Sequence, residues 1–135
     1  MQIDWPGVAV AIVAGMAVAF VWYQKGPIAD AWERLTGVTP ARSRPARTRN
    51  MTQLLLAVTV TACGLGAAVS MARSATGDES VGMALLVGFV AWLTLSASTL
   101  LQHNAFELKP AKLTLINTAY QLALFLAMSL AIGLT

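Results

Sequence analysis

The only histidine of the sequence, His103, lies four residues before Glu107. Side chains at positions i and i+4 of a helix share one face. This pair could therefore act as a general acid and base, as part of a metal site, or as a hydrogen bond that ends a helix and holds the next loop. A metal site needs three or four ligands, and the single cysteine, Cys63, lies far away in an apolar run. We expect no metal or other cofactor, and we favour the structural hydrogen bond over catalysis and over conduction of a proton or solute.

A second group of polar side chains lies in the last apolar run of the chain. At about 100° per residue, Asn117, Tyr120 and Gln121 fall on one sector of a helix, and Thr114 shares that sector. A buried amide needs hydrogen-bond partners, and the nearest candidates stand at the ends of other apolar runs. We therefore predict one polar cluster, which comprises Tyr23, Gln102, His103, Glu107, Asn117, Tyr120 and Gln121.

Composition indicates which elements position these side chains. Of the 135 residues, 57% are hydrophobic and 11% are charged, whereas a soluble domain carries about 25% charged residues. The mean hydropathy of +0.67 also argues against a soluble, disordered or fibrous chain. Four runs lack Asp, Glu, Lys and Arg, at about 6–23, 52–72, 81–101 and 113–134. Each is long enough to cross about 30 Å of hydrocarbon as a helix. We predict an all-α integral membrane protein, with a single domain over residues 1–135 that forms a compact bundle of four transmembrane helices.

The charged residues are sorted between the loops. Eight of the nine basic residues lie in the segment 24–50, which includes Lys25, or in the loop between the third and fourth runs, and only Arg73 lies on the other side. The positive-inside rule places both basic loops in the cytoplasm and both ends outside. We expect a multi-pass protein of the cytoplasmic (inner) membrane of a bacterium. Its first run, which no basic residue precedes, is interpreted as a retained span rather than a signal peptide.

The long basic loop divides into two parts. In Pro27–Leu35 the apolar side chains share one helical face, which predicts a short interfacial helix between the first two spans, ended by Gly37. The following Thr39–Asn50 contains two prolines, and we expect it to be extended. Its arginines are either contacts to lipid headgroups or a solvated topology signal: Arg42, Arg44, Arg47 and Arg49. Aromatic residues near the span ends are expected interface anchors: Trp5, Trp22 and Trp32.

Small residues spaced four apart predict close packing of the helices. Each span has such a row, and in lipid small residues let helix backbones approach one another. Because four spans enclose little interior, we expect at least one row to face another subunit. The rows are Ala11, Gly15 and Ala19; Ala62, Gly66 and Ser70; Ala84 and Gly88, with Ser96 further along; and Ala119, Ala123, Ala127 and Ala131.

A series of short motifs resembles a known family over nearly the whole chain. The motifs are Asp4-Trp5, Trp22-Tyr23, Ala31-Trp32, Leu35-Thr36-Gly37, Trp92, Phe106-Glu107, and Leu115-Ile116-Asn117 with Tyr120. Their order and spacing resemble the small four-span bacterial membrane proteins catalogued as domain of unknown function 1761. The resemblance implies the four-helix fold and no particular activity. The segment Thr39–Asn50 departs from the family pattern.

Three classes of function remain open. The sequence favours a structural or accessory membrane subunit without catalytic activity, which self-associates or packs in a larger membrane complex among membrane lipids. An oligomeric channel or carrier for a small neutral or lipid-like solute is the alternative, because no span contains charged residues of the kind typical of ion-coupled transport. A membrane enzyme ranks third. Nucleic-acid binding is not expected, because a few loop arginines come with no reading element.

Overall fold

The computed structural model describes residues 2–24 and 26–135, and within them it is helical with no strand. The predicted contribution of Lys25 to the basic loop lies outside the described residues. Four helical stretches are long and apolar enough to cross a membrane: Trp5–Trp22, Pro40–Thr76, Val81–Phe106 and Ala111–Leu134. The elements are α1 (Trp5–Trp22), α2 (Pro27–Thr36), α3 (Pro40–Ser43), a 3₁₀ turn η1 (Arg44–Ala46), α4 (Arg47–Thr76), α5 (Val81–Ala91), a π-helical segment η2 (Trp92–Ala97), α6 (Ser98–Phe106) and α7 (Ala111–Leu134).

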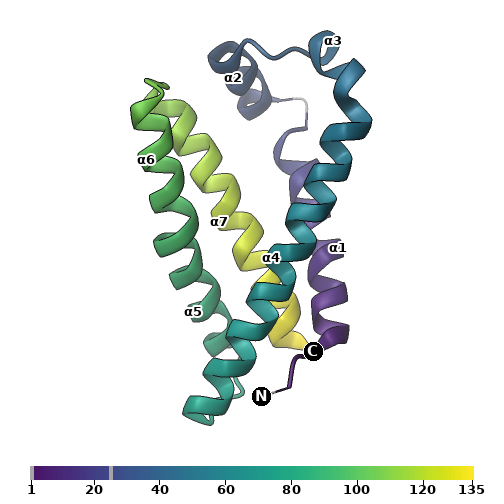
Figure 1. Cartoon of the computed structure of the whole chain (residues 1–135), viewed down its shortest axis with the longest axis vertical. Helices are drawn as coiled ribbons and strands as arrows, with labels where there is room; N and C mark the ends of the chain where they lie inside the picture. Colours follow the sequence, from purple (N-terminus) through teal and green to yellow (C-terminus); the bar gives the residue numbers. More distant parts are fainter. Residues whose placement is uncertain (1, 25) are drawn as a thin grey trace.

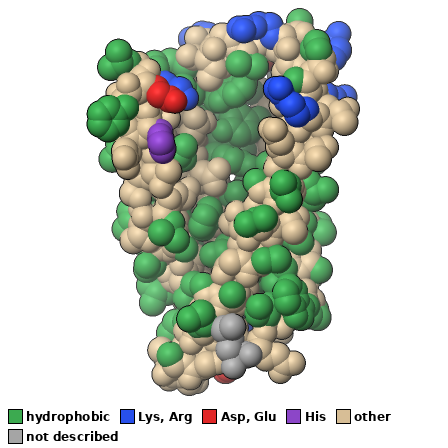
Figure 2. Space-filling model, in the orientation of Figure 1, with side chains coloured by type: hydrophobic (Ala, Val, Ile, Leu, Met, Phe, Trp, Pro, Cys, Tyr) green, Lys and Arg blue, Asp and Glu red, His purple; other side chains and the backbone are tan. Residues whose placement is uncertain are grey.

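Helix α7 is the centre of the bundle, because α1, α4, α5 and α6 all pack against it. Both ends of the described chain lie at one end of the bundle, which we call the closed end: residues 3–8, 66–77, 81–88 and 128–135 (Figure 1). The opposite end, which we call the basic end, holds residues 20–24, 26–54 and 98–118. Towards the basic end α4 diverges from α6 (Figure 1), and the space-filling view shows an opening between them (Figure 2).

Small residues bring the helices together at the closed end. A Cβ atom on Gly66 would lie 2.6 Å from a methyl group of Val8, and one on Gly88 would collide with the Ser129 side chain. Three of the predicted small-residue rows accordingly hold buried residues. In the fourth row only Ala131 is buried, whereas Ala119, Ala123 and Ala127 are partly buried because α7 turns its larger side chains inward, and whether this row faces another subunit stays a prediction. The buried residues of α7 include Tyr120, Leu124, Met128, Ala131 and Ile132.

The segment Thr39–Asn50 is helical, so the expectation of an extended chain is wrong. Each proline stands where a helix tolerates it: Pro40 opens α3 and Pro45 lies in the first turn of η1. The Thr39 hydroxyl caps α3 by accepting from the Arg42 amide at 3.3 Å, as threonine commonly does at this position. By contrast, α2 forms as predicted and ends at Gly37, which adopts the left-handed conformation with φ of 71°. Glycine is the usual residue at such a helix end.

The third long helix is not regular throughout. The segment η2 between α5 and α6 has π-helical geometry, which the sequence did not predict. Trp92, its first residue, donates from Nε1 to the backbone carbonyl of Thr118 in α7 at 2.9 Å. Such π segments widen a helix locally and occur often at functional sites. The irregular turn is therefore tied to the central helix beside the opening.

Candidate functional site

An aromatic cluster joins α1, α2 and α7 at the basic end. Tyr23 stacks edge-on against Trp32, with ring centroids 5.5 Å apart, and lies 5.1 Å from the ring of Tyr120. The ring of Trp22 also lies beside that of Tyr120, with ring centroids 6.3 Å apart. The Tyr23 hydroxyl donates to Oδ1 of Asn117 at 3.1 Å. The structure therefore brings together three members of the predicted polar cluster, from helices far apart in the sequence.

The remaining members from the third span do not join that cluster. The side chains of Gln102, His103 and Glu107 are exposed. Glu107 pairs with Lys109 at 2.9 Å, and that ammonium holds the pKa of the Glu107 carboxyl below its usual value. The predicted hydrogen bond between the His103 and Glu107 side chains is absent among the described residues. Only their backbones are bonded, from the Glu107 amide to the His103 carbonyl at 3.0 Å.

Asn104 performs the tie that was expected of His103. Its side chain is buried, and its Nδ2 donates to the Thr114 hydroxyl in α7 at 3.0 Å. The Asn104 carbonyl accepts from the Lys109 amide at 2.9 Å. The end of α6 is thus fixed to the start of α7 by an uncharged amide, one residue along from the histidine.

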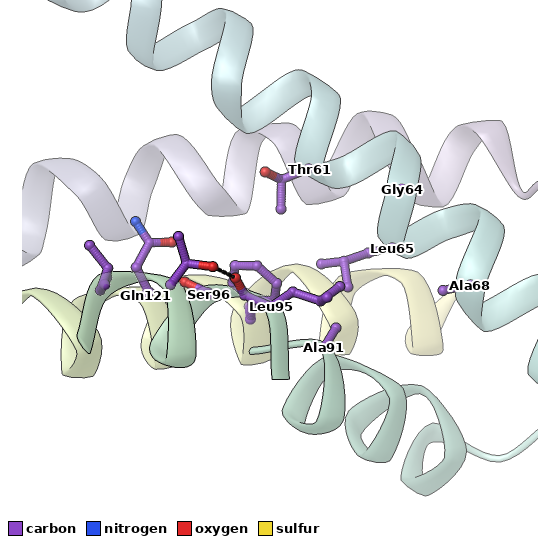
Figure 3. A pocket seen from close by; sticks show the side chains of 11 residues that line it. Thr61, Gly64, Leu65, Ala68, Ala91, Leu95, Ser96 and Gln121 are labelled. Atoms are coloured by element: carbon purple, nitrogen blue, oxygen red, sulfur yellow. Dashed lines mark hydrogen bonds between the residues drawn. The ribbon is translucent and has the colours of Figure 1, made fainter. Parts of the chain in front are cut away.

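The opening between α4 and the third long helix contains a cleft of about 540 Å³ with α7 as its floor. Most of its lining is apolar, and Figure 3 shows the polar side chains of Thr61 on α4, Ser96 on η2 and Gln121 on α7 around it. The sequence reasoning did not assign Thr61, Ser96 or Thr99 to a binding cleft, although the hydroxyls of Ser96 and Thr99, three residues apart in an apolar helix, were a usable signal. The lining residues are Thr61, Gly64, Leu65, Ala68, Ala91, Leu95, Ser96, Thr99, Leu100, Gln121 and Phe125.

The polar groups of this cleft differ in whether the chain satisfies them. Thr99 donates to the Leu95 carbonyl one turn earlier at 2.6 Å, as hydroxyls in apolar helices commonly do. Within the described chain, no side-chain hydrogen bond is formed by Thr61, Ser96 or Gln121. Transfer of an amide from water to hydrocarbon without a hydrogen-bond partner costs on the order of several kcal/mol. The cleft is therefore a place where an uncharged polar group from outside the chain would be bound.

Acid–base chemistry has no support in this cleft, because none of its lining residues titrates near neutral pH. Within residues 2–24 and 26–135, no group of three or more His, Cys, Asp or Glu side chains lies close enough to share a metal ion. The arrangement can form hydrogen bonds with a neutral group and contacts with an apolar one.

The closed end carries a separate set of polar contacts. Asp4 accepts from the Thr135 hydroxyl at 2.6 Å and from the Gly7 amide at 3.0 Å. These two hydrogen bonds, with a smaller contribution from the Arg73 charge, hold the pKa of Asp4 below its usual value. The Arg73 Nη2 atom donates to the Gly133 carbonyl at 3.4 Å. These contacts join α1, α4 and α7.

The predicted lipid-contacting arginines all lie at the basic end, in α3, η1 and the first turn of α4 (Figure 2). Arg42 is engaged within the loop, because its Nη1 donates to the Gly37 carbonyl at 2.7 Å. Of the predicted anchors, Trp22 and Trp32 are half-buried in the aromatic cluster, whereas Trp5 is exposed beside the closed end. Their contact with lipid stays a prediction.

Comparison with known proteins identifies a family. The model of the family described as Protein of unknown function (DUF1761) matches residues 6–133, which cover the four long helices and the cleft. The family resemblance inferred from the short motifs is thereby confirmed. No curated protein and no solved structure matches the chain.

Proposed function

This chain belongs to the DUF1761 family of proteins of unknown function, and we propose its role from its own geometry. The protein is an integral subunit of a bacterial inner membrane without catalytic activity. It associates with a second copy of itself, or in a larger membrane complex, through the cleft between α4 and η2. The observation on which this rests is the uncharged Gln121 amide, which faces that cleft without a partner among the described residues.

Charge sorting supports the membrane orientation. The described basic loop residues lie at one end of the four apolar helices (Figure 2), and Arg73, in the last turn of α4, lies at the other. The positive-inside rule then puts the basic end in the cytoplasm and the closed end outside. A topology test uses single cysteines in a Cys63→Ala background. Ser43→Cys should react with an impermeant maleimide only after lysis, and Asp78→Cys should react in intact cells. The reverse pattern would refute this orientation.

Incomplete burial supports self-association. In the apolar window of Val81–Phe106 only 11% of the residues are buried inside the chain, so much of this helix stays exposed in one copy although α5 packs against α7. The cleft walls carry small residues such as Gly64, Ala68 and Ala91, which permit close approach of another helix. Interhelical hydrogen bonds from amides and hydroxyls are a recognised source of association in membranes. A helix of a second copy would supply apolar contact and a partner for Gln121.

The test measures the monomer–dimer equilibrium in proteoliposomes by energy transfer between labelled copies at increasing lipid dilution. Gly64→Trp should fill the cleft and weaken association, and Gln121→Leu should weaken it by about fivefold, since one interhelical hydrogen bond contributes about 1 kcal/mol. Val60→Trp is the matched control, because Val60 is exposed on α4 and does not line the cleft. A wild-type protein that stays monomeric at every dilution contradicts self-association.

The polar groups on both walls of the cleft also favour a second candidate, a path for a small neutral or lipid-like solute. Thr61, Ser96 and Gln121 line an opening that lies beside the bundle core (Figure 3). Under this alternative, reconstituted protein would support solute flux that Gln121→Leu and Asn117→Leu abolish. Loss of thermal stability in Asn117→Leu without any flux in the wild type would leave the subunit role preferred.

A further inference from the structure

A cavity of about 320 Å³ lies at the basic end where η1 meets the first turn of α4. Its lining includes Arg44, Arg47 and Asn50, and also Met51. Within residues 2–24 and 26–135, neither arginine is within ion-pairing distance of a carboxylate. No acidic side chain lines the cavity. The site therefore presents two cationic side chains and an amide whose complement is an anion.

A second cavity begins at the same methionine. It has a volume of about 540 Å³ and lies between α1, α4 and α7, with Met51 and Leu54 on one side and Phe20, Tyr23 and Tyr120 on the other. No described charged residue lines it, and the Tyr23 hydroxyl is already bonded to Asn117. Met51 therefore lines both the cationic cavity and the apolar groove.

The two cavities follow one another along α4. The first is lined by Arg47, Asn50 and Met51, and the second by Met51 and by Leu54, which lies about one helical turn further along. An acyl chain that starts beside Met51 would therefore lie between α1, α4 and α7. The molecule is hollowed in this half, and Lys and Arg side chains stand at the rim of the hollow (Figure 2).

We propose that these two cavities form a binding site for one anionic phospholipid of the cytoplasmic leaflet. Its phosphate is held by Arg44 and Arg47, and one acyl chain lies in the groove formed by Met51, Leu54 and Tyr120. A free phosphate ion or an acidic peptide would fill the first cavity and leave the apolar groove empty, whereas a phospholipid matches both. This inference rests on the proposed function, because a phospholipid reaches the site only when the helices lie in a bilayer.

The experiment measures lipid retained by the full-length protein after extraction from vesicles with equal amounts of phosphatidylglycerol and phosphatidylcholine of identical acyl chains. Native mass spectrometry counts the bound molecules. Wild-type protein should retain phosphatidylglycerol preferentially. The double variant Arg44→Gln/Arg47→Gln should lower that retention by about thirtyfold, because each basic residue near an anionic headgroup contributes roughly 1 kcal/mol.

Two further variants separate a specific site from general charge attraction. Arg34→Gln/Lys112→Gln removes the same charge from the same end but from residues that neither line the cavity nor belong to the predicted headgroup contacts, and it should retain the wild-type preference. Met51→Trp keeps every charge and obstructs the junction, so it should also lose the bound lipid. Glycerol phosphate, which has the headgroup charge but no acyl chain, should not displace the lipid.

The possible results separate failure of the lipid site from failure of the proposed membrane orientation. Equal loss of lipid in Arg44→Gln/Arg47→Gln and in the control double variant, or displacement by glycerol phosphate, overturns the lipid site. Equal retention of the two lipids by a protein whose Ser43→Cys is labelled only after lysis overturns the lipid site and leaves the proposed orientation standing. Recovery of the protein outside the membrane fraction overturns the proposed function itself.

Discussion

The helices pack against one another through small residues at the closed end of the bundle and through aromatic rings at the basic end. At the closed end, Gly66 and Gly88 let α1, α4, α5 and α7 come into direct contact, and Asp4 ties the ends of α1 and α7 together. At the basic end, rings such as Tyr23 and Tyr120 fill the space between helices, and α4 diverges from α6 (Figure 1). The closed end also holds a cavity of about 360 Å³, whose lining includes Asp4, Arg73 and Thr135. The two proposed binding sites lie in the open half, where bulky rings separate the helices.

The largest expected effect is at Gly88. Gly88→Ala places a Cβ against the buried Ser129 side chain, and such overpacking destabilises by about 1–3 kcal/mol. Gly64→Ala is the matched control on the open cleft, because a Cβ there meets nothing within 4 Å. Ala also favours a helix over Gly by up to about 1 kcal/mol. Thermal unfolding in detergent should therefore move the two variants in opposite directions. A stabilised Gly88→Ala would break the distinction between the ends.

The hydrogen bond from Tyr23 to Asn117 gives the next effect, at the basic end. Tyr23→Phe removes the donor and leaves the Asn117 carbonyl oxygen without its partner, so we expect a loss of about 1–3 kcal/mol. Asn117→Leu with Tyr23→Phe completes a double-mutant cycle, in which the coupling between the two sites isolates this bond. Additive losses would show that the aromatic packing, rather than the hydrogen bond, holds α1 to α7.

The difference between the ends explains what the sequence could predict. The apolar runs predicted four long helices because helix length and composition are local properties. The cluster of Tyr23, Asn117 and Tyr120 was predictable because its α7 members share one face of a regular helix. The predicted structural tie by His103 was wrong. A shift of one residue along a helix rotates a side chain by about 100°, so Asn104 rather than His103 faces α7. The cleft could not be predicted, since it depends on the π-helical turn and on the angle between α4 and α6.

A smaller effect is expected at Asp4. Its folded pKa is depressed below the usual value of 3.8. Its contribution to stability is therefore complete above that usual value and is lost as the pH falls through the folded pKa. Asp4→Asn retains a capping side chain but loses the charge, which should lower stability at neutral pH by about a few tenths of a kcal/mol, because solvent screens a surface carboxylate. Unfolding measured between neutral pH and about pH 3 should show the variant converging with the wild type. A constant difference across that range would assign the effect to the cap alone.

The smallest effect is expected at Glu107, the carboxylate that the sequence placed beside His103. Its partner is Lys109, and the side chains of Lys109 and Glu107 are 45% and 57% exposed. Water and salt therefore screen their attraction. Glu107→Gln should leave the unfolding temperature unchanged at neutral pH, and His103→Ala should do the same because that side chain is exposed.

Asn104→Ala on the same turn supplies the contrast, since it leaves the Thr114 hydroxyl without its donor. This variant should lower stability by about 1 kcal/mol, measured by the same unfolding experiment. A larger loss in Glu107→Gln than in Asn104→Ala would mean that charge, and not the buried amide, fixes the basic end of α6. The aromatic and amide contacts would then no longer account for how this half of the bundle stays open.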